Sequence, residues 1–332
     1  MSNWPDVAVI MPVLNEEKYL AAAVQAILDQ NYPGKLRIVL AIGPSKDQTK
    51  QIAENLAQRD SRILITQSPT GRTPDSLNIA IASCTEEIIV RVDAHAELSP
   101  KYIETAIETL ERSGADNVGG IMAATGVTNF EKAVAAAMTS SLGVGNAAFH
   151  TGGVEGPADS VYLGVFRRTA LSRVGGYDSE FTRAQDWEMN FRIRNSGGLV
   201  WFNPNLSVTY RPRPNITKLA KQYFEYGTWR REVMRQHPET RFNKSALRYY
   251  APPLAVVGID LGLIFGFIGL LQDSILKLGF LGPLGYVLIT FFSALTLAKK
   301  AKSGAKWLAI VLPTMQLSWG VGFLFGKSRR TT

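Results

Sequence analysis

The sequence is poor in cysteine and in charge, and it lacks the glycine motifs that bind phosphates. Cys84 is the only cysteine among 332 residues, so no disulfide can form within the chain, which suits a reducing compartment. Charged residues make up only 19% of the chain and hydrophobic residues 46%, which is apolar for a soluble enzyme. No G-x-G-x-x-G follows the first predicted strand and no G-x-x-x-x-G-K-[ST] is present, which argues against a dinucleotide-binding site and a P-loop.

The net charge of +8 indicates an anionic partner but does not identify it. A basic chain suits nucleic acid, anionic lipid or phosphorylated substrates. Aromatic and basic residues do not interleave in an RNP-like or zinc-finger pattern, so nucleic acid is not expected as a partner. The stretch "MSNWPDVAVIMPV" has no basic segment ahead of its short apolar run, so a signal peptide is not expected either.

The last part of the chain holds three long apolar runs, over residues 251–271, 278–298 and 307–326. Each has about 20 residues, the length that a helix needs to cross about 30 Å of hydrocarbon. Buried helices of a soluble domain are the alternative, which three consecutive runs disfavour. We therefore predict one domain over 1–245 and a membrane region over 246–332 with two to three transmembrane helices.

The positive charges around these runs give conflicting signals about orientation. Four lysines lie between the second and third runs: Lys299, Lys300, Lys302 and Lys306. The positive-inside rule places that loop in the cytoplasm, together with the N-terminal domain if all three runs cross. The basic stretch 327–330 then falls outside, so one run can instead be re-entrant or interfacial. We expect a multi-pass protein of the cell membrane whose N-terminal domain is cytoplasmic.

The first part of the chain alternates between strand and helix patterns. Strands are predicted over 6–13, 36–43, 62–68 and 87–93, and helices over 15–30, 46–60 and 73–84. Asn15 is a candidate cap for the first helix. The alternation predicts an α/β fold with a parallel sheet and crossover helices, in which ligands bind beyond the carboxyl ends of the strands. Asp93 and His95 stand at the end of the fourth strand, where that rule places a ligand.

The sequence Asp93-Ala94-His95 offers one oxygen ligand and one nitrogen ligand. Together they can hold a divalent cation against a diphosphate. The alternative is a solvated aspartate in a turn beside a surface histidine, and the spacing alone leaves both possibilities open.

The stretch "RAQDWEMNFRIR", residues 183–194, begins an amphipathic helix with two carboxylates, Asp186 and Glu188. A carboxylate near a helix N-terminus is stabilised by the helix dipole, so capping is one interpretation. The other is a general base that takes a proton from an acceptor hydroxyl.

The stretch "KQYFEYGTWRR", residues 221–231, mixes aromatic and cationic residues. Aromatic faces stack on sugar rings and arginine binds phosphate. An amphipathic helix that lies on the membrane ahead of the first apolar run is the alternative, and both can hold together.

Taken together, these segments resemble the family 2 glycosyltransferases, the inverting enzymes of GT-A fold. Within that family they are most similar to bacterial membrane-anchored exopolysaccharide enzymes of the succinoglycan type. The resemblance covers roughly residues 6–235 and includes "VAVIMPVLNEE", "GRTPDSLNIAI", "VRVDAHAE", "VYLGVFRRTALSRVGGYDSEF", "QDWEMNFRIR" and "QYFEYGTWR". It implies a GT-A domain, a Rossmann-like and mostly parallel sheet with flanking helices, followed by the transmembrane region.

The resemblance also implies where the nucleotide-sugar donor binds. Pro12, Leu14 and Glu16 match positions that cradle the nucleotide base. Asp47 matches a further donor-site aspartate, and Arg72 matches a basic residue near the diphosphate.

The metal, the base and the acceptor side follow from the same resemblance. Asp93 and His95 match the metal-binding D-x-D position, which implies a Mg²⁺ or Mn²⁺ cofactor and donor contacts at Asp93. Asp186 matches the catalytic base. The residues that match positions near the acceptor and the diphosphate are Gln222, Trp229 and Arg230.

The sequence departs from the family pattern in four features. Ile42 stands where the second strand normally ends in an aspartate that recognises uracil, so the resemblance does not imply a UDP donor. His95 replaces the last aspartate of D-x-D, and Gln185 replaces a glutamate before the base. The order Trp229-Arg230 reverses the common Arg-Trp order.

The function expected from the resemblance is transfer of a sugar from a nucleotide-sugar donor to a saccharide acceptor with inversion, in cell-surface polysaccharide biosynthesis. The membrane tail suggests that a polyprenyl diphosphate carries the acceptor and that membrane lipids are partners. One alternative is a polyprenyl-phosphate glycosyltransferase, which charges the lipid phosphate itself. Another is a non-catalytic membrane-anchored protein that binds nucleotide sugars.

Overall fold

The computed structural model describes residues 4–242, 247–301 and 305–328. The chain divides into two compact units. The first unit consists of Met1–Ala123 and Ala148–Tyr210, and the second of Ala124–Ala147 and Arg211–Thr332.

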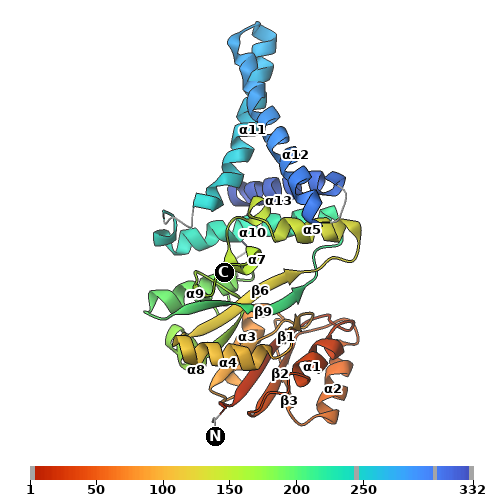
Figure 1. Cartoon of the computed structure of the whole chain (residues 1–332), viewed down its shortest axis with the longest axis vertical. Coiled ribbons are helices and arrows are strands. Elements are labelled where there is room, and N and C mark those ends of the chain that lie inside the picture. Colours follow the sequence, from red (N-terminus) through yellow and green to blue (C-terminus); the bar gives the residue numbers. More distant parts are fainter. Residues whose placement is uncertain (1–3, 243–246, 302–304, 329–332) are drawn as a thin grey trace. The chain divides into compact units, whose positions relative to one another are not determined.

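A single mixed sheet forms the centre of the first unit (Figure 1). Its strands in the described residues are β1 Val7–Val13, β2 Leu36–Ile42, β3 Ile63–Gln67, β4 Ile88–Arg91, β5 Glu97–Leu98, β6 Asn117–Ala124, β7 Gly156–Pro157, β8 Tyr162–Arg167 and β9 Val200–Tyr210. Their spatial order is β3-β2-β1-β4-β8-β6-β9-β5, with β7 also paired to β9. Strands β1 to β4 run parallel, whereas β8 pairs antiparallel with β4 and with β6. The predicted α/β fold is confirmed, and the antiparallel half is an addition to it.

The helices of the first unit cover the two faces of this sheet. They are α1 Leu20–Leu28, α2 Thr49–Arg59, α3 Thr73–Ala82, α4 Tyr102–Ser113, α7 Ala148–Thr151, α8 Arg168–Val174 and α9 Gln185–Asn195. Alternate residues of a strand point to opposite faces, so a strand covered on both faces is apolar throughout. In β1, Val7 and Val9 belong to the core cluster that includes Leu20, while Ala8 and Ile10 belong to the cluster on the other face.

The first predicted helix begins later than its sequence pattern indicated. Helix α1 starts at Leu20 after Tyr19 as its N-cap, so the prediction that Asn15 caps it is wrong. Asn15 instead adopts a left-handed backbone with φ of 56°. Its side-chain oxygen accepts a hydrogen bond from the backbone N–H of Lys46 at 2.8 Å, which joins the loops that follow β1 and β2.

The second unit is helical and contains the apolar runs. Its elements are α5 Asn129–Met138, α6 Ser141–Val144, α10 Ile216–Gln236, η1 Pro238–Thr240, α11 Leu247–Gln272, η3 Ile275–Phe280, α12 Leu281–Ala301 and α13 Ala305–Phe325. Three stretches are long and apolar enough to cross a membrane: Arg248–Gln272, Ile275–Lys299 and Lys306–Phe325. Helices α11 and α12 form a hairpin, while α13 lies along α10 and near α5 (Figure 1).

Candidate functional site

The candidate site is built on loops that follow the carboxyl ends of the parallel strands. The backbone N–H of Glu16, after β1, donates to the hydroxyl of Thr49 at 2.7 Å. Thr49 belongs to α2, which follows β2, and its hydroxyl in turn donates to Asp47 at 2.5 Å. The Thr49 hydroxyl lowers the pKa of the Asp47 carboxyl below its ordinary value. These bonds hold Glu16 and Asp47 at the strand edge where the fold places a ligand.

Arg91 joins the two most important carboxylates of the site. It is the last residue of β4 and is only 3% exposed. Its Nη2 lies 3.1 Å from Oδ1 of Asp93, and its Nη1 donates to Oδ1 of Asp186. One guanidinium therefore connects the predicted metal ligand to the predicted base, although Asp186 is 95 positions further along the chain than Arg91.

The charges of these three residues are strongly coupled. Burial raises the pKa of Asp186, the Arg91 guanidinium opposes that rise, and the nearby Asp93 adds to it. Burial alone lowers the pKa of Arg91, but the charges of Asp186 and Asp93 outweigh it and hold that pKa well above its ordinary value. The ring of Tyr177 adds a cation–π contact, with its centroid 5.8 Å from the guanidinium carbon.

Asp186 does not act as the cap of its helix. Helix α9 begins at Gln185, and its N-cap is Ala184, which makes no side-chain capping bond. The carboxylate of Asp186 turns to Arg91 instead. Asp186 still lies in the first turn of α9, where the helix dipole stabilises a carboxylate, so the dipole interpretation and the base interpretation both remain open.

His95 is held by Glu16. The Nδ1 atom of His95 lies 3.0 Å from Oε1 of Glu16. A carboxylate on one ring nitrogen favours the tautomer whose other nitrogen carries the lone pair, which is the usual arrangement around a metal-binding histidine. Asp93 and His95 are therefore chemically suited to a divalent cation. No group of three or more His, Cys, Asp or Glu side chains gathers for a metal in the part of the chain that the structure describes.

The other predicted donor residues lie on the same strand edge. Pro12 is in β1 and Leu14 follows it, and a Leu14 methyl group packs where the backbones of Gly43 and Gly71 meet. Arg72 begins the turn into α3 and donates to the backbone carbonyl of Ser179, so it ties α3 to the segment ahead of α9.

The three predicted acceptor residues belong to the second unit. Gln222, Trp229 and Arg230 all lie on α10. Gln222 and Trp229 are buried, and Gln222 donates to the hydroxyl of Tyr226 at 2.8 Å. The guanidinium carbon of Arg230 lies 4.0 Å from the ring centroid of Tyr249.

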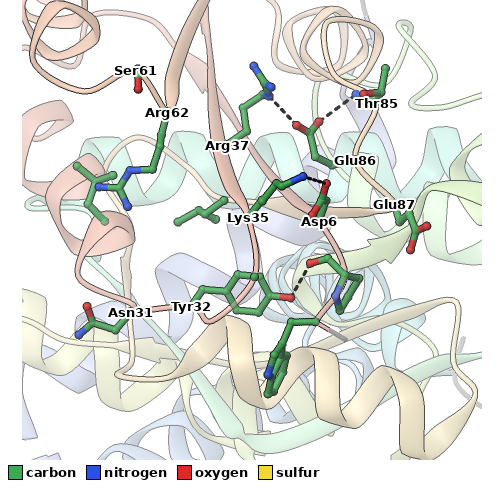
Figure 2. Close-up of a pocket in the computed structure, with 15 residues that line it drawn as sticks. Asp6, Asn31, Tyr32, Lys35, Arg37, Ser61, Arg62, Thr85, Glu86 and Glu87 are labelled. Carbon is green, nitrogen blue, oxygen red and sulfur yellow. Dashed lines mark hydrogen bonds and ion pairs between the residues drawn. The ribbon is translucent and has the colours of Figure 1, made fainter. Parts of the chain in front are cut away.

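A hollow of about 1110 Å³ lies at the opposite end of the parallel strands (Figure 2). Its volume would admit a nucleotide sugar, but its lining residues Asp6, Lys35, Arg62 and Glu87 directly precede β1 to β4. Two ion pairs lie within this lining, Lys35 with Asp6 at 3.7 Å and Arg37 with Glu86 at 2.5 Å. The carboxyl-end site is therefore the better candidate.

The main functional residue that the sequence prediction missed is Arg91. Its signal was a cation inside an otherwise apolar strand, "EIIVRVD", where a charge is costly unless it is paired.

Comparison with known proteins decides the family. A family model described as glycosyl transferase family 2 matches residues 8–175, about half of the chain. The chain belongs to this family. Both the predicted membership and the predicted enzyme class, a glycosyltransferase, are confirmed.

Relatives in the family extend the comparison to almost the whole chain. Succinoglycan biosynthesis protein ExoA of Rhizobium meliloti (strain 1021) is 29% identical over 317 residues, 95% of this chain and 93% of that protein. Dolichyl N-acetyl-alpha-D-glucosaminyl phosphate 3-beta-D-2,3-diacetamido-2,3-dideoxy-beta-D-glucuronosyltransferase of Methanococcus voltae is 24% identical over 230 residues, 67% of this chain and 71% of that protein.

A solved structure supports the fold. Mannosyltransferase PcManGT from Pyrobaculum calidifontis, in complex with GDP-Man and Mn²⁺, aligns with a TM-score of 0.63 and 18% identity. The alignment covers 98% of this chain and 90% of that chain. At this identity the likeness concerns the fold, and it agrees with the predicted GT-A architecture.

The pairing at Arg91 predicts a pH-dependent loss of stability on its removal. Arg91→Met leaves Asp186 and Asp93 without their shared cation, which should lower the free energy of unfolding by about 3–5 kcal/mol at about pH 8. The pKa of folded Asp186, already raised, then rises further above its unfolded value, so the folded state binds the proton more tightly. Stability should therefore recover as the pH falls to about 5. Unfolding in detergent with EDTA measures both effects.

The matched control for this variant is Arg37→Met. Arg37 is a half-exposed arginine of the same sheet, and its Nε lies 2.5 Å from Glu86. A partly exposed pair of this kind contributes about 0–1 kcal/mol. Equal losses in the two variants, or a loss in Arg91→Met that does not change with pH, would contradict the pairing.

Proposed function

We propose that this glycosyltransferase moves a sugar from a nucleotide-sugar donor to the hydroxyl of a lipid-linked saccharide, with inversion, in cell-surface polysaccharide biosynthesis. Residues 1–245 would form the cytoplasmic catalytic region and residues 246–332 the membrane region. The observation that carries the proposal is the Asp93–Arg91–Asp186 arrangement at the carboxyl end of β4 in a family 2 chain.

Asp186 would act on the acceptor. Its carboxylate takes the proton of the attacking hydroxyl, so that the oxygen can form a bond to the anomeric carbon as the bond to the diphosphate oxygen breaks. Attack from the face opposite the leaving group inverts the anomeric centre, and the donor leaves as a nucleoside diphosphate. Arg91 holds the carboxylate in place and favours its ionised form, which a base requires.

Asp93 and His95 would hold a Mg²⁺ or Mn²⁺ ion, whose charge would offset that of the departing diphosphate. Glu16 orients His95 for this purpose through the 3.0 Å contact to Nδ1. The bound Mn²⁺ of PcManGT, a protein of the same fold, supports a divalent ion as cofactor.

The donor base would lie near Pro12, Leu14 and Glu16, with Asp47 as a further donor-site residue. The residue at the end of β2 is Ile42, which is 2% exposed. That position therefore holds a buried apolar side chain and offers no carboxylate to uracil. This supports a donor other than a UDP-sugar. The GDP-Man of PcManGT is an example within the same fold.

The acceptor is proposed to be lipid-linked because the same chain carries apolar helices long enough to span a bilayer. The name of the Methanococcus voltae relative describes a dolichyl-linked sugar phosphate as acceptor, and that of ExoA describes succinoglycan biosynthesis. Attachment to the membrane would confine enzyme and acceptor to one surface and raise their effective concentration. Gln222, Trp229 and Arg230 are proposed to serve the acceptor or the diphosphate.

A donor screen tests the proposed reaction. The detergent-extracted protein is given UDP-, GDP- and dTDP-sugars with Mg²⁺, Mn²⁺ or EDTA, with and without a lipid-linked saccharide extract. We expect nucleoside diphosphate release from one donor class that requires the metal and rises at least several-fold with the extract. Saturable nucleotide binding without release from any donor would instead indicate a non-catalytic binding protein.

Replacing the proposed base gives a second prediction. Asp186→Asn should lower turnover per folded molecule by about 10²–10⁴-fold, because the amide cannot take the proton of the hydroxyl, while donor binding measured by calorimetry is unchanged. The variant also loses the charge that balances Arg91, so the folded fraction is measured beside turnover. Asp159→Asn is the control, since it removes a half-exposed carboxylate of the same unit that pairs with Arg194 at 3.7 Å. Near-normal turnover of Asp186→Asn would favour an acceptor that is already ionised, as in a polyprenyl-phosphate glycosyltransferase.

A further inference from the structure

The third apolar helix, α13, differs from the other two in where its side chains lie. Four of its apolar side chains are 0% exposed: Leu308, Val311, Leu312 and Met315. In contrast, large apolar side chains of α11 and α12 face outward, with Leu271 88% exposed and Ile289 68% exposed. Many apolar side chains of α13 are therefore covered by packing within the protein, whereas large apolar side chains of α11 and α12 are exposed.

The helix against which α13 packs cannot itself lie in hydrocarbon. Helix α10 carries seven charged residues: Lys218, Lys221, Glu225, Arg230, Arg231, Glu232 and Arg235. Each charge at the bilayer centre costs about 2.5–3.5 kcal/mol on insertion scales. The backbones of α10 and α13 approach so closely that a Cβ on Gly227 would lie 1.9 Å from the carbonyl oxygen of Trp319. The two helices must therefore share the same depth.

Polar contacts fix the C-terminal end of α13 to α10. Arg231 donates to the backbone carbonyl of Leu324 at 2.7 Å and also to that of Gly326. The hydroxyl of Ser328 donates to Glu232 at 3.0 Å. Arg231 and Glu232 both belong to α10. The C-terminal end of α13 therefore lies at the same depth as the charged α10, and not on the other side of a bilayer from α10.

The rest of α13 is fixed to α5 and α6 of the same unit. The ring of Trp307 packs edge-to-face on Phe130 of α5 with centroids 5.6 Å apart. The amide of Gln316 donates to the carbonyl of Leu142 in α6 at 2.9 Å. Helix α5 begins with a capping box of Thr128 and Glu131, whose carboxylate needs water or polar neighbours. The start and the middle of α13 thus lie at the same depth relative to the membrane as its end, outside the hydrocarbon.

We infer that α13 lies in the plane of the membrane surface as a docking surface for the anionic lipid headgroups, and that only the α11–α12 hairpin crosses. Its outward apolar side chains, Ile310 and Phe325, would enter the boundary between headgroups and chains. The inference rests on the proposed membrane attachment and is independent of the proposed reaction.

This topology removes the conflict between the basic segments. Lys299 and Lys306, on either side of the connection between α12 and α13, and Lys327 after α13 all fall on the cytoplasmic side, since α13 no longer separates them. Each such charge near an anionic leaflet contributes about 1 kcal/mol of attraction. The hairpin turn, which would be outside, holds the paired charges Asp273 and Lys277, so it carries no positive excess.

Cysteine accessibility tests the topology on the full-length chain. Cys84 is the only cysteine and is buried, so a Cys84→Ala background can receive one exposed cysteine at a time. Three matched lysine replacements serve: Lys50→Cys in α2, Lys277→Cys in the hairpin turn and Lys327→Cys after α13. The probe is a membrane-impermeant maleimide, applied to sealed spheroplasts and again after permeabilisation.

We expect Lys277→Cys to be labelled in sealed spheroplasts, and Lys50→Cys and Lys327→Cys only after permeabilisation, with at least a tenfold increase. Labelling of Lys327→Cys but not Lys50→Cys in sealed spheroplasts would show that α13 crosses and would overturn the inference. Protection of Lys277→Cys would overturn it too, because the hairpin would not cross. Labelling of Lys50→Cys in sealed spheroplasts would instead overturn the cytoplasmic placement of the proposed function.

Discussion

The arrangement of the candidate site depends on one buried cation between two carboxylates. Arg91 lies in a central parallel strand, paired in register with Ile10 of β1, so the sheet fixes its backbone. A buried guanidinium is costly unless its charge is balanced. Asp93 and Asp186 balance it, and in doing so they bring the turn after β4 and the start of α9 together. The interaction that balances the charge of Arg91 in the core therefore also brings the proposed metal ligand and the proposed base together.

Polar side chains also need partners in the two units, but the units meet this need in different ways. In the first unit, apolar strands covered on both faces provide a rigid edge, and polar side chains are confined to the loops beyond it. In the second unit, apolar helices coexist with the charged α10, and polar contacts such as Arg231 to the end of α13 determine which helices stay near the surface. Length and hydropathy alone do not make that distinction.

Much of the first unit could be predicted from local patterns. The predicted strand over 36–43 is β2 Leu36–Ile42, because a short, mostly apolar run between polar turns is typical of a buried strand. Asn15 failed as a cap because its side chain bonds to a loop that follows another strand, which no local pattern contains. The antiparallel half was not predicted, since β6 includes Gly119 and Gly120, which lack strand propensity and are required by close backbone packing.

The residues of the candidate site could be proposed from the sequence, but their connections could not. The roles of Asp93, His95 and Asp186 stay predictions that rest on residue type and on resemblance to the family. Their partners, Arg91 and Glu16, were not assigned to them because each contact joins segments brought together only by the fold. In the second unit, α13 has the length and composition of a spanning helix, and only its contacts indicate another position.

The coupling free energy between Arg91 and Asp186 tests the central claim most directly. It is measured by a double-mutant cycle in unfolding free energy, with Arg91→Met, Asp186→Asn and the double variant at neutral pH. The pairing predicts that the double variant is more stable than the sum of the single losses implies, by about 1–3 kcal/mol. Additive losses would show that the two side chains do not interact, and Arg91 could then not be the residue that assembles the active site.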